Sequence, residues 1–306
     1  MDREGGIAML MTKEQFQASI RARKPMNVYF LGKKIEDLTT FPPLAASFNA
    51  ISTIYDLQSR PEWKDLITVP SHLSGQPVSI YNAPLRSAED ANRKTRAARA
   101  LAEVVGCCTH RCTGSEAFAG LGPACYDMDH DLGTRYFDRF MKFLDYVQRN
   151  DLTCTVTVTD VKGLRTLAPH EQPDPDMYVH VNEVRDDGIV ISGYKCNQTG
   201  ILFAHEIVIV PTTNMRPEDK AFALACAVPA DTPGLTFVLG RTPQDKRFFE
   251  VGGDIEGIDL GKKYADHQAL VYFDHVFVPN DRVFMCGETK YVGRLLSYFT
   301  AVHRLT

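Results

Sequence analysis

The sequence has no excess of basic residues and no long hydrophobic run. Its 306 residues include 34 Lys and Arg against 38 Asp and Glu, which gives a formal net charge of −4. A nucleic-acid-binding surface needs basic residues to neutralise phosphates, so nucleic acid is not an expected partner. No segment approaches the ~18 consecutive apolar residues of a membrane-spanning helix. The first residues also lack the basic and apolar regions of a signal peptide. We expect a cytoplasmic protein without a membrane partner.

Cysteine is sparse for this length, and the eight cysteines are unevenly placed. Four of them lie between residues 107 and 125, and the other four are scattered. In a reducing compartment such a group indicates metal or redox chemistry rather than disulfides. The scattered cysteines are typical of buried core thiols.

The first half of the chain has helical periodicity. A chain of this length is expected to form about two domains. Thr12 and Gln15 have the spacing of a capping box, and Ser87 precedes two acidic residues as an N-cap does. The apolar residues that follow Ser87 predict a helix that reaches residue 108. Further helices are predicted over residues 45–59 and 134–150. We assign residues 1–150 to an N-terminal helical domain.

The hydrophobic period changes to two after residue 150. Alternating segments lie near residues 153–159, 178–181, 189–191, 207–210, 235–239 and 270–278. Strands without helices between them predict an antiparallel sheet that closes into a small barrel or sandwich. We assign residues 151–282 to this middle β-domain, and the fold class is α+β.

Residues 283–306 begin a third, helical part of the chain. The apolar face of this helix is expected to lack a partner, which implies a further chain segment or another subunit. The residues of this face are Val292, Leu295, Leu296, Phe299 and Val302.

The sequence CTHRC at residues 108–112 is the most specific local feature. On one continuous helix Cys108 and Cys112 would lie one turn apart on the same face. Two thiolates at that spacing could hold an iron–sulfur cluster or a zinc ion, and Arg111 would help to keep them ionised. Two buried core cysteines are the alternative interpretation.

Two polar segments of the β-region are candidates for contact with a flavin. The first contains Thr159, Asp160, Lys162 and Gly163, and the second contains Gln198 and Thr199. Backbone N–H groups, hydroxyls and amides suit the edge of an isoalloxazine ring. Ordinary hairpin turns are the alternative.

Six short segments in order resemble one known family. They are VYFLGKKI (28–35), CTHRC (108–112), NDL (150–152), DGIV (187–190), QTG (198–200) and FVPNDR (277–282). The chain is similar over essentially its whole length to the 4-hydroxyphenylacetate 3-monooxygenase family. Within that family it most resembles the 4-hydroxybutyryl-CoA dehydratase (vinylacetyl-CoA Δ-isomerase) branch.

The resemblance implies a fold, an assembly and two cofactors. The family fold is acyl-CoA-dehydrogenase-like, and a C-terminal helical bundle forms the core of a homotetramer. Most of that bundle would lie beyond Thr306. The dehydratase branch carries FAD and a 4Fe–4S cluster, whose matching ligands here are Cys108, Cys112 and His303. A further cysteine follows the histidine in that branch.

The resemblance also implies the reaction, which is dehydration of a 4-hydroxyacyl-CoA. The α-proton leaves first, FAD accepts one electron, and the β-hydrogen is removed as a ketyl radical forms. The cluster acts as a Lewis acid on the hydroxyl, with His303 as a weak ligand and base. Thr199 bonds the flavin or the substrate carbonyl, and Asp160 and Lys162 help to seat the flavin.

The sequence departs from the dehydratase pattern at several points. Gln268 stands where the family has a catalytic Glu, and His110 stands where it has Gln. The third cysteine would also lie beyond Thr306, so we expect the 306-residue chain alone to be inactive.

Two alternatives to the dehydratase remain. The monooxygenase branch uses an Arg, a Tyr and a His around a phenol. Arg111 could match the Arg, but Ser115 and Val156 lie near the other two positions. This branch would hydroxylate an aromatic substrate with reduced flavin. A non-catalytic fragment is the other alternative.

Overall fold

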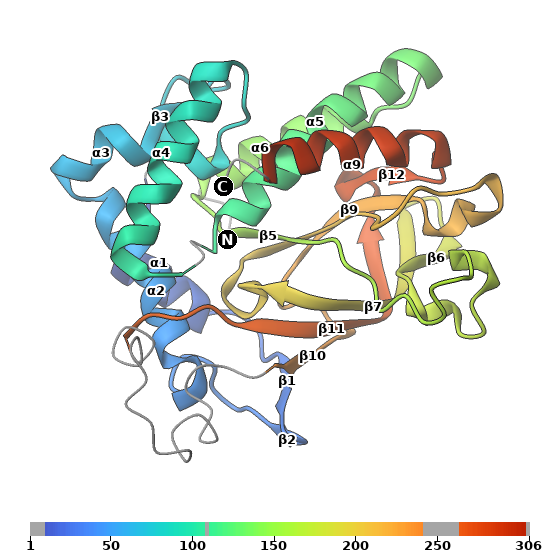
Figure 1. The fold of residues 1–306 in the computed structure, drawn as a ribbon, viewed down its shortest axis with the longest axis horizontal. Coiled ribbons are helices and arrows are strands. Elements are labelled where there is room, and N and C mark those ends of the chain that lie inside the picture. The colour runs from blue at the N-terminus through green and yellow to red at the C-terminus, as the bar shows by residue number, and fades with distance from the viewer. Residues whose placement is uncertain (1–9, 108–109, 241–262, 304–306) are drawn as a thin grey trace.

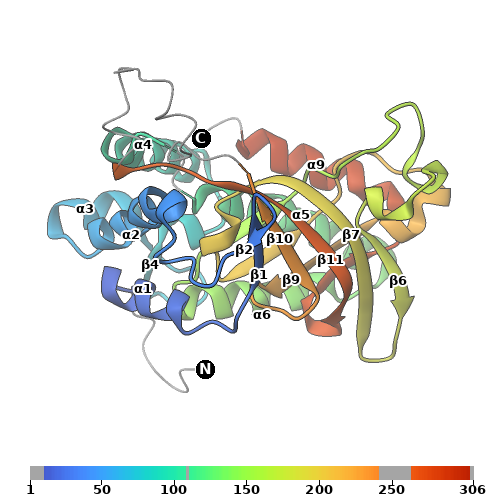
Figure 2. The ribbon, with the colours of Figure 1, turned by 90° about the horizontal axis from the view of Figure 1, so that it is seen from below.

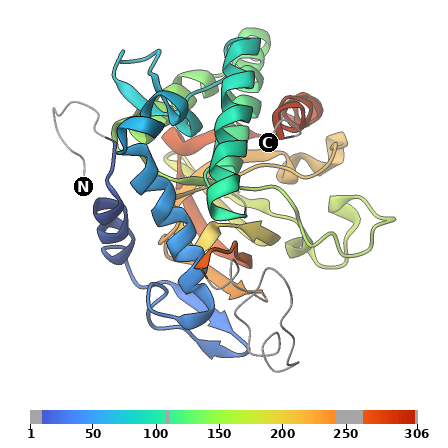
Figure 3. The ribbon, with the colours of Figure 1, turned by 60° about the vertical axis from the view of Figure 1, so that its left-hand side comes forward.

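The computed structural model describes residues 10–107, 110–240 and 263–303, as helices that lie against open sheets (Figure 1). The helices that position the site are α1 (Lys13–Arg21), α2 (Ala45–Gln58), α3 (Pro61–Ile67), α4 (Ala88–Val105), α5 (Cys112–Leu132), α6 (Tyr136–Arg149) and α9 (Thr289–His303). Helices α1 to α4 lie to one side of the sheets (Figure 3).

Two predicted helix starts are confirmed at the level of their hydrogen bonds. The Gln15 backbone N–H donates to Thr12 Oγ1, and the Thr12 backbone N–H donates to the Gln15 side chain, which completes the capping box of α1. The Asp90 backbone N–H donates to Ser87 Oγ at the start of α4. These bonds satisfy helix N–H groups that have no partner within the helix.

The third helix is shorter than predicted, and it does not continue through residue 112. Helix α4 ends at Val105, because Gly106 takes a left-handed conformation with a φ of 62° and its N–H donates to Ala102 O at 2.7 Å. Glycine adopts this conformation without a steric penalty and ends many helices in this way. Cys112 is instead the first residue of the separate helix α5.

The larger sheet has the strand order β2-β1-β10-β11-β7-β6, and Figure 2 labels all of these strands. Its strands are β1 (Asn27–Phe30), β2 (Lys33–Lys34), β6 (His180–Val184), β7 (Gly188–Thr199), β10 (Leu235–Leu239) and β11 (Gln268–Pro279). A second sheet has the order β12-β9-β8-β5, with β5 (Cys154–Thr157), β8 (Glu206–Ile209), β9 (Leu224–Pro229) and β12 (Val283–Cys286). A small hairpin joins β3 (Thr68–Pro70) to β4 (Pro77–Ser79).

The predicted antiparallel barrel is not found among the described strands. They form open sheets, and two pairs are parallel: β1 with β10, and β5 with β8. Strand β1 comes from the first 150 residues, yet it lies in the sheet of the β-region. Alternation of apolar residues indicates which face of a strand is buried. It does not indicate whether the neighbouring strand runs parallel or antiparallel. The division at residues 150 and 282 stays a prediction.

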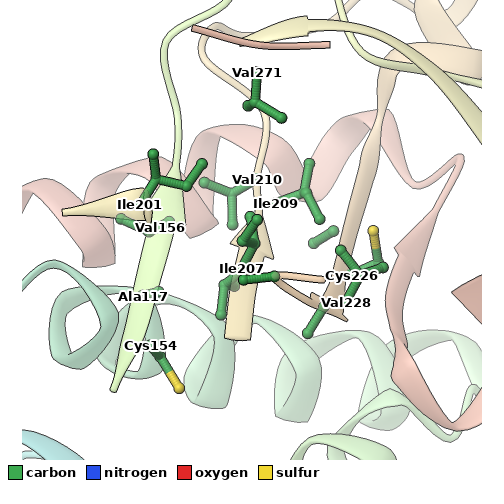
Figure 4. Close-up of a cluster of buried hydrophobic side chains, with 14 of the residues drawn as sticks. Ala117, Cys154, Val156, Ile201, Ile207, Ile209, Val210, Cys226, Val228 and Val271 are labelled. Atoms are coloured by element: carbon green, nitrogen blue, oxygen red, sulfur yellow. The ribbon is translucent and has the colours of Figure 1, made fainter. Parts of the chain in front are cut away.

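The second sheet packs against helix α5 and forms the centre of the core. Every residue of β5 and β8 is buried. Figure 4 shows Cys154 and Val156 of β5 with Ile207 and Ile209 of β8, close to Ala117 of α5. A Cβ built on Gly114 of α5 would lie 2.4 Å from Cys154 O, so only glycine permits this approach. The packing fixes the N-terminal turns of α5 over β5.

Helix α9 lies alongside α5, which corrects the expectation that its apolar face has no partner (Figure 1). Val292, Leu295 and Phe299 are buried, and Phe299 packs next to Gly120 of α5. Hydrogen bonds from Tyr291 to Asp131 and from His303 to Glu116 show that the two helices are antiparallel. No helix in the described part of the chain is long and apolar enough to span a membrane.

Candidate active site

Three segments from distant parts of the chain meet at one end of the larger sheet. Thr199 ends β7 and lies opposite Gln268, the first residue of β11. The Gly200 N–H donates to His267 O at 3.0 Å, and a Cβ on Gly200 would lie 3.3 Å from the side chain of His110. The structure therefore brings together the two predicted catalytic residues Thr199 and Gln268, next to the loop that precedes α5.

His110 occupies the centre of this junction in a strained conformation. Its φ is 59°, and its side chain is fully buried. Burial lowers the pKa of His110 to about 4, so the ring is neutral at pH 7. The ring meets that of His267 edge-on at 5.6 Å.

His267 ties the junction to two other elements. Its Nε2 accepts from the Leu202 N–H at 3.0 Å, which leaves Nδ1–H to donate to Ser47 Oγ on α2. Burial, reinforced by the neighbouring His110, lowers the pKa of His267 well below its ordinary value. Both histidines are therefore neutral groups within the core.

The predicted metal ligands lie at the facing ends of α5 and α9. Cys112 is half-buried in the first turn of α5, and Cys108 lies outside the described residues. One turn after Cys112, the buried carboxylate of Glu116 accepts a hydrogen bond from His303 Nδ1 at 2.7 Å. The His303 ring also stacks on Phe299, with 5.7 Å between ring centroids. The structure thus places His303 against the helix turn that follows Cys112.

A buried lysine lies close to this group. Lys94 of α4 donates hydrogen bonds to Ser115 Oγ and to Ala83 O. Burial lowers the pKa of Lys94 to about 8, while the negative charges of Glu116 and Cys112 act in the opposite direction. A thiol, a carboxylate, an imidazole and an amine from three helices therefore share one region.

Arg111 does not serve the thiols as predicted. Its side chain is buried, and Nη2 donates to Asp151 Oδ1 at 2.7 Å while Nη1 donates to Gln58 Oε1 at 3.1 Å. The guanidinium also lies 4.5 Å from the ring centre of Tyr55. Asp151 supplies the opposite charge that a buried cation needs. Arg111 therefore anchors the start of α5 in the core.

The two predicted flavin segments are neighbours, but they are not both loops. Residues 193–199 continue strand β7, so the second segment is neither the polar loop expected for a flavin contact nor a hairpin turn. Thr159 O accepts hydrogen bonds from the Cys196 N–H at 2.9 Å and from Gln198 Nε2 at 3.2 Å. Gln198 is buried and Thr159 is exposed, so the backbone and side chain of one segment hold the other in place.

The Asp160 side chain is buried and makes its contacts within the protein. It forms a buried ion pair with Lys195 at 2.8 Å and accepts the Val179 N–H at 3.1 Å. Burial raises the pKa of Asp160, and the Lys195 ammonium opposes that rise. Lys162 and Gly163 follow in a turn where both residues have a positive φ. Lys162 is half-buried and Gly163 is exposed, so both are accessible.

Sequence reasoning missed Glu116 and Lys94. A glutamate and a lysine in amphipathic helices are ordinarily solvated, and only the arrival of α9 and α4 buries them. The spacing of Glu116 from Cys112 was the available signal, because residues four apart share a helix face. Among the described residues, no three His, Cys, Asp or Glu side chains lie close enough to hold a metal ion.

The chain belongs to the family described as "4-hydroxyphenylacetate 3-hydroxylase N terminal", whose model matches residues 12–285. It is 39% identical over 297 residues to a 4-hydroxybutyryl-CoA dehydratase/vinylacetyl-CoA-Δ-isomerase of Clostridium aminobutyricum, which covers 97% of this chain and 60% of the relative. The resemblance inferred from the sequence is confirmed.

Solved structures give the same relationship. An oxygen-tolerant archaeal 4-hydroxybutyryl-CoA dehydratase from N. maritimus superposes with a TM-score of 0.90 at 34% identity, over 97% of this chain and 58% of that one. The oxygenase component (HpaB) of 4-hydroxyphenylacetate 3-monooxygenase complexed with FAD superposes with a TM-score of 0.78 at 26% identity, over 96% and 59%. The chain thus spans about three fifths of the length of these relatives.

Proposed function

We propose that the protein is a flavin- and iron–sulfur-dependent enzyme that dehydrates a 4-hydroxyacyl-CoA. The type reaction is conversion of 4-hydroxybutyryl-CoA to crotonyl-CoA. The placement of Cys112 and of the Glu116–His303 pair on two neighbouring helices carries the proposal. It is supported by 39% identity to a dehydratase over nearly the whole chain.

The residues present suit the two cofactors in their donor chemistry. Thiolate and imidazole are ligands that an iron–sulfur cluster accepts, and Cys112 and His303 would hold it together with Cys108. Thr199, at the end of β7, and the adjoining segment of Thr159 would border the flavin. When bound, the flavin supplies one-electron chemistry and the cluster supplies a Lewis acid.

The chain's own residues would then orient the substrate and move protons. The Thr199 hydroxyl would donate a hydrogen bond to the thioester carbonyl and favour loss of the α-proton. His303 would act as a base toward the substrate, and its Nδ1 lies 2.7 Å from the Glu116 carboxylate. Gln268 lies opposite Thr199, where its amide can hold a substrate oxygen but cannot take a proton.

An anaerobic turnover assay tests the proposal. The full-length protein, loaded with iron, sulfide and FAD, is expected to convert 4-hydroxybutyryl-CoA to crotonyl-CoA, measured by mass spectrometry of the thioesters. Thr199→Val should lower kcat by about 10- to 100-fold, the loss of one hydrogen bond to a developing charge. The control is Thr157→Val, because Thr157 donates to Val208 O inside the core. Failure of the loaded protein to form crotonyl-CoA would refute the proposal.

A reduced-flavin aromatic monooxygenase is the second candidate, and the 26% identity to HpaB favours it. Ser115 and Val156, which lie near the positions of the monooxygenase Tyr and His, do not favour it. Ser115 is engaged with buried Lys94, and Val156 is packed in the core of β5. Oxygen uptake that depends on a phenol, by iron-free protein with reduced flavin, would establish this alternative. A non-catalytic fragment would show neither activity and would bind neither flavin nor acyl-CoA.

We further propose the assembly that the family resemblance implies. The full-length protein would have the acyl-CoA-dehydrogenase-like arrangement, with helical residues 1–150, a β-domain over 151–282 and a C-terminal bundle that begins at 283–306. That bundle would form the core of a homotetramer in the cytoplasm. Light scattering of the full-length protein measures this state, and a monomer would contradict it.

A further inference from the structure

We infer that His267 is a positioning residue of the candidate site, because it clamps the turn after Thr199 to the start of β11. In this role it holds Thr199 and Gln268 opposite each other at the end of the larger sheet. The inference deepens the proposed function and rests on it for the roles of Thr199 and Gln268. The clamp itself consists of hydrogen bonds that can be tested without turnover.

The first argument is that His267 holds the turn at two points. Thr199 is the last residue of β7 and pairs with Gln268, the first residue of β11. The end of a strand pair opens most easily, because it has neighbours on one side only. The His267 carbonyl accepts the Gly200 N–H at 3.0 Å, and its ring Nε2 accepts the Leu202 N–H at 3.0 Å. Backbone and side chain of one residue thus close the strand end that carries Thr199.

The second argument is that the turn depends on an acceptor from outside. Gly200 has a left-handed φ of 73° and is the N-cap of the short 3-10 helix η5 (Ile201–Phe203). The first N–H groups of a helix have no partner within it, and glycine has no side chain to accept from them. His267 supplies the acceptor for Leu202 from a position 65 residues further along the chain. Leu202 is fully buried, so loss of this acceptor would leave its N–H unpaired away from water.

The third argument is that the orientation of the ring is itself fixed. A backbone N–H can only donate, so Nε2 of His267 is unprotonated and Nδ1 carries the proton of the neutral ring. Nδ1–H donates to Ser47 Oγ on α2, and both residues are 1% exposed. The ring of Phe203 meets the imidazole edge-on, with 5.1 Å between ring centroids. Helix α2 therefore orients the imidazole, and the imidazole orients the turn.

Two amide variants separate the hydrogen bonds of the ring. In His267→Gln the side-chain amide reaches the place of Nε2 and can accept from Leu202, but the bond to Ser47 is lost. In His267→Asn the shorter side chain reaches only the place of Nδ1, so it can donate to Ser47 and leaves the Leu202 N–H without an acceptor. Each variant loses one buried hydrogen bond, so urea unfolding should show similar stability for the two. A difference between them in other properties therefore results from the acceptor for Leu202.

Hydrogen exchange of the full-length protein, resolved to single amides by mass spectrometry, measures the clamp. The amides of Gly200 and Leu202 should be protected in the wild type. His267→Asn should speed the exchange of both by about 10- to 100-fold, and His267→Gln should leave both close to the wild type. The amides of the buried strand β8 should be unchanged in both variants. Free exchange at Leu202 in the wild type would overturn the inference even if His267→Asn fails to fold.

His205 offers a matched control, because it is a neutral histidine of the opposite tautomer. Its Nδ1 accepts the Thr153 N–H at 3.0 Å, and its Nε2 lies 2.8 Å from Ser19 Oγ. At this position asparagine is the variant that keeps the backbone acceptor. His205→Asn should therefore leave the exchange of Leu202 unchanged, and faster exchange there would show that any histidine lost from this part of the core opens the turn.

Turnover separates this inference from the proposed function. In the full-length holoenzyme, His267→Asn should lower kcat about 10- to 100-fold with little change in KM for the acyl-CoA, because Thr199 is displaced from the reacting carbonyl. His267→Gln should restore most of kcat. Equal exchange in the two amide variants, or equal kcat in an active enzyme, would overturn the inference. The expected exchange in a protein without turnover would uphold the clamp and remove the proposed function.

Discussion

Replacement of Arg111 by methionine should destabilise the protein strongly, because it leaves a buried carboxylate without its cation. Methionine preserves most of the length and apolar volume of the side chain but removes the 2.7 Å ion pair with Asp151 and the 3.1 Å bond to Gln58. Both members of the ion pair are 1% exposed. Removal of one partner from such a pair costs about 3–5 kcal/mol, and the lost stacking on Tyr55 adds to this.

Urea unfolding followed by circular dichroism at pH 7 measures this loss. The matched control is Arg99→Met, because the Arg99–Glu103 pair is 82% and 67% exposed and should contribute at most about 1 kcal/mol. A loss of less than about 1 kcal/mol for Arg111→Met would refute the reasoning. It would mean that Arg111 is not held in the core and is available to the thiols after all.

Three further outcomes are expected. Gly114→Ala should lower the free energy of unfolding by about 1–3 kcal/mol, because its Cβ would meet the backbone of Cys154. Gly122→Ala should lower it by less in the same urea assay, because its Cβ would meet only a side chain, at 3.3 Å. Burial lowers the pKa of His205 to about 3 from its ordinary 6.5. Its unfolded form therefore binds the proton first, and stability should fall as the pH drops from 6.5 toward 3. Over the same pH range, the free energy of unfolding of His205→Gln should fall by up to about 5 kcal/mol less than that of the wild type. Identical pH profiles would contradict this assignment. Gln268→Glu should raise kcat for 4-hydroxybutyryl-CoA by about 100-fold or more if it restores a general base, and an unchanged kcat would show that another group serves as the base.

Local signals in the sequence were sufficient for most helices and strands. The capping box of Thr12 and the N-cap of Ser87 depend only on residues within one turn, so they could be predicted. The end of α4 had a comparable signal in Gly106, which the apolar periodicity across it obscured. Strand pairing depends on distant residues. The parallel pairing of β1 with β10 joins Asn27 to Thr236, and no local pattern contains that direction.

The candidate site shows the same division. Cys112, His303, Thr199 and Gln268 could be named from the family resemblance, and the structure brings Thr199 opposite Gln268. The contact of Glu116 with His303 could not be predicted, because the two residues lie 187 positions apart in the chain. Its burial results from the packing of α9 on α5 and not from its own sequence neighbours.

The iron content of the anaerobically isolated full-length protein tests the central claim most directly. Iron, sulfide and flavin would be counted in the wild type and in Cys112→Ala, with Cys125→Ala as the control. Cys125 lies on the same helix, but it is buried and its Sγ donates to Phe284 O. The account predicts four irons per chain for the wild type and for Cys125→Ala, with loss of iron in Cys112→Ala. Iron-free wild type, or iron that Cys112→Ala retains in full, would contradict it.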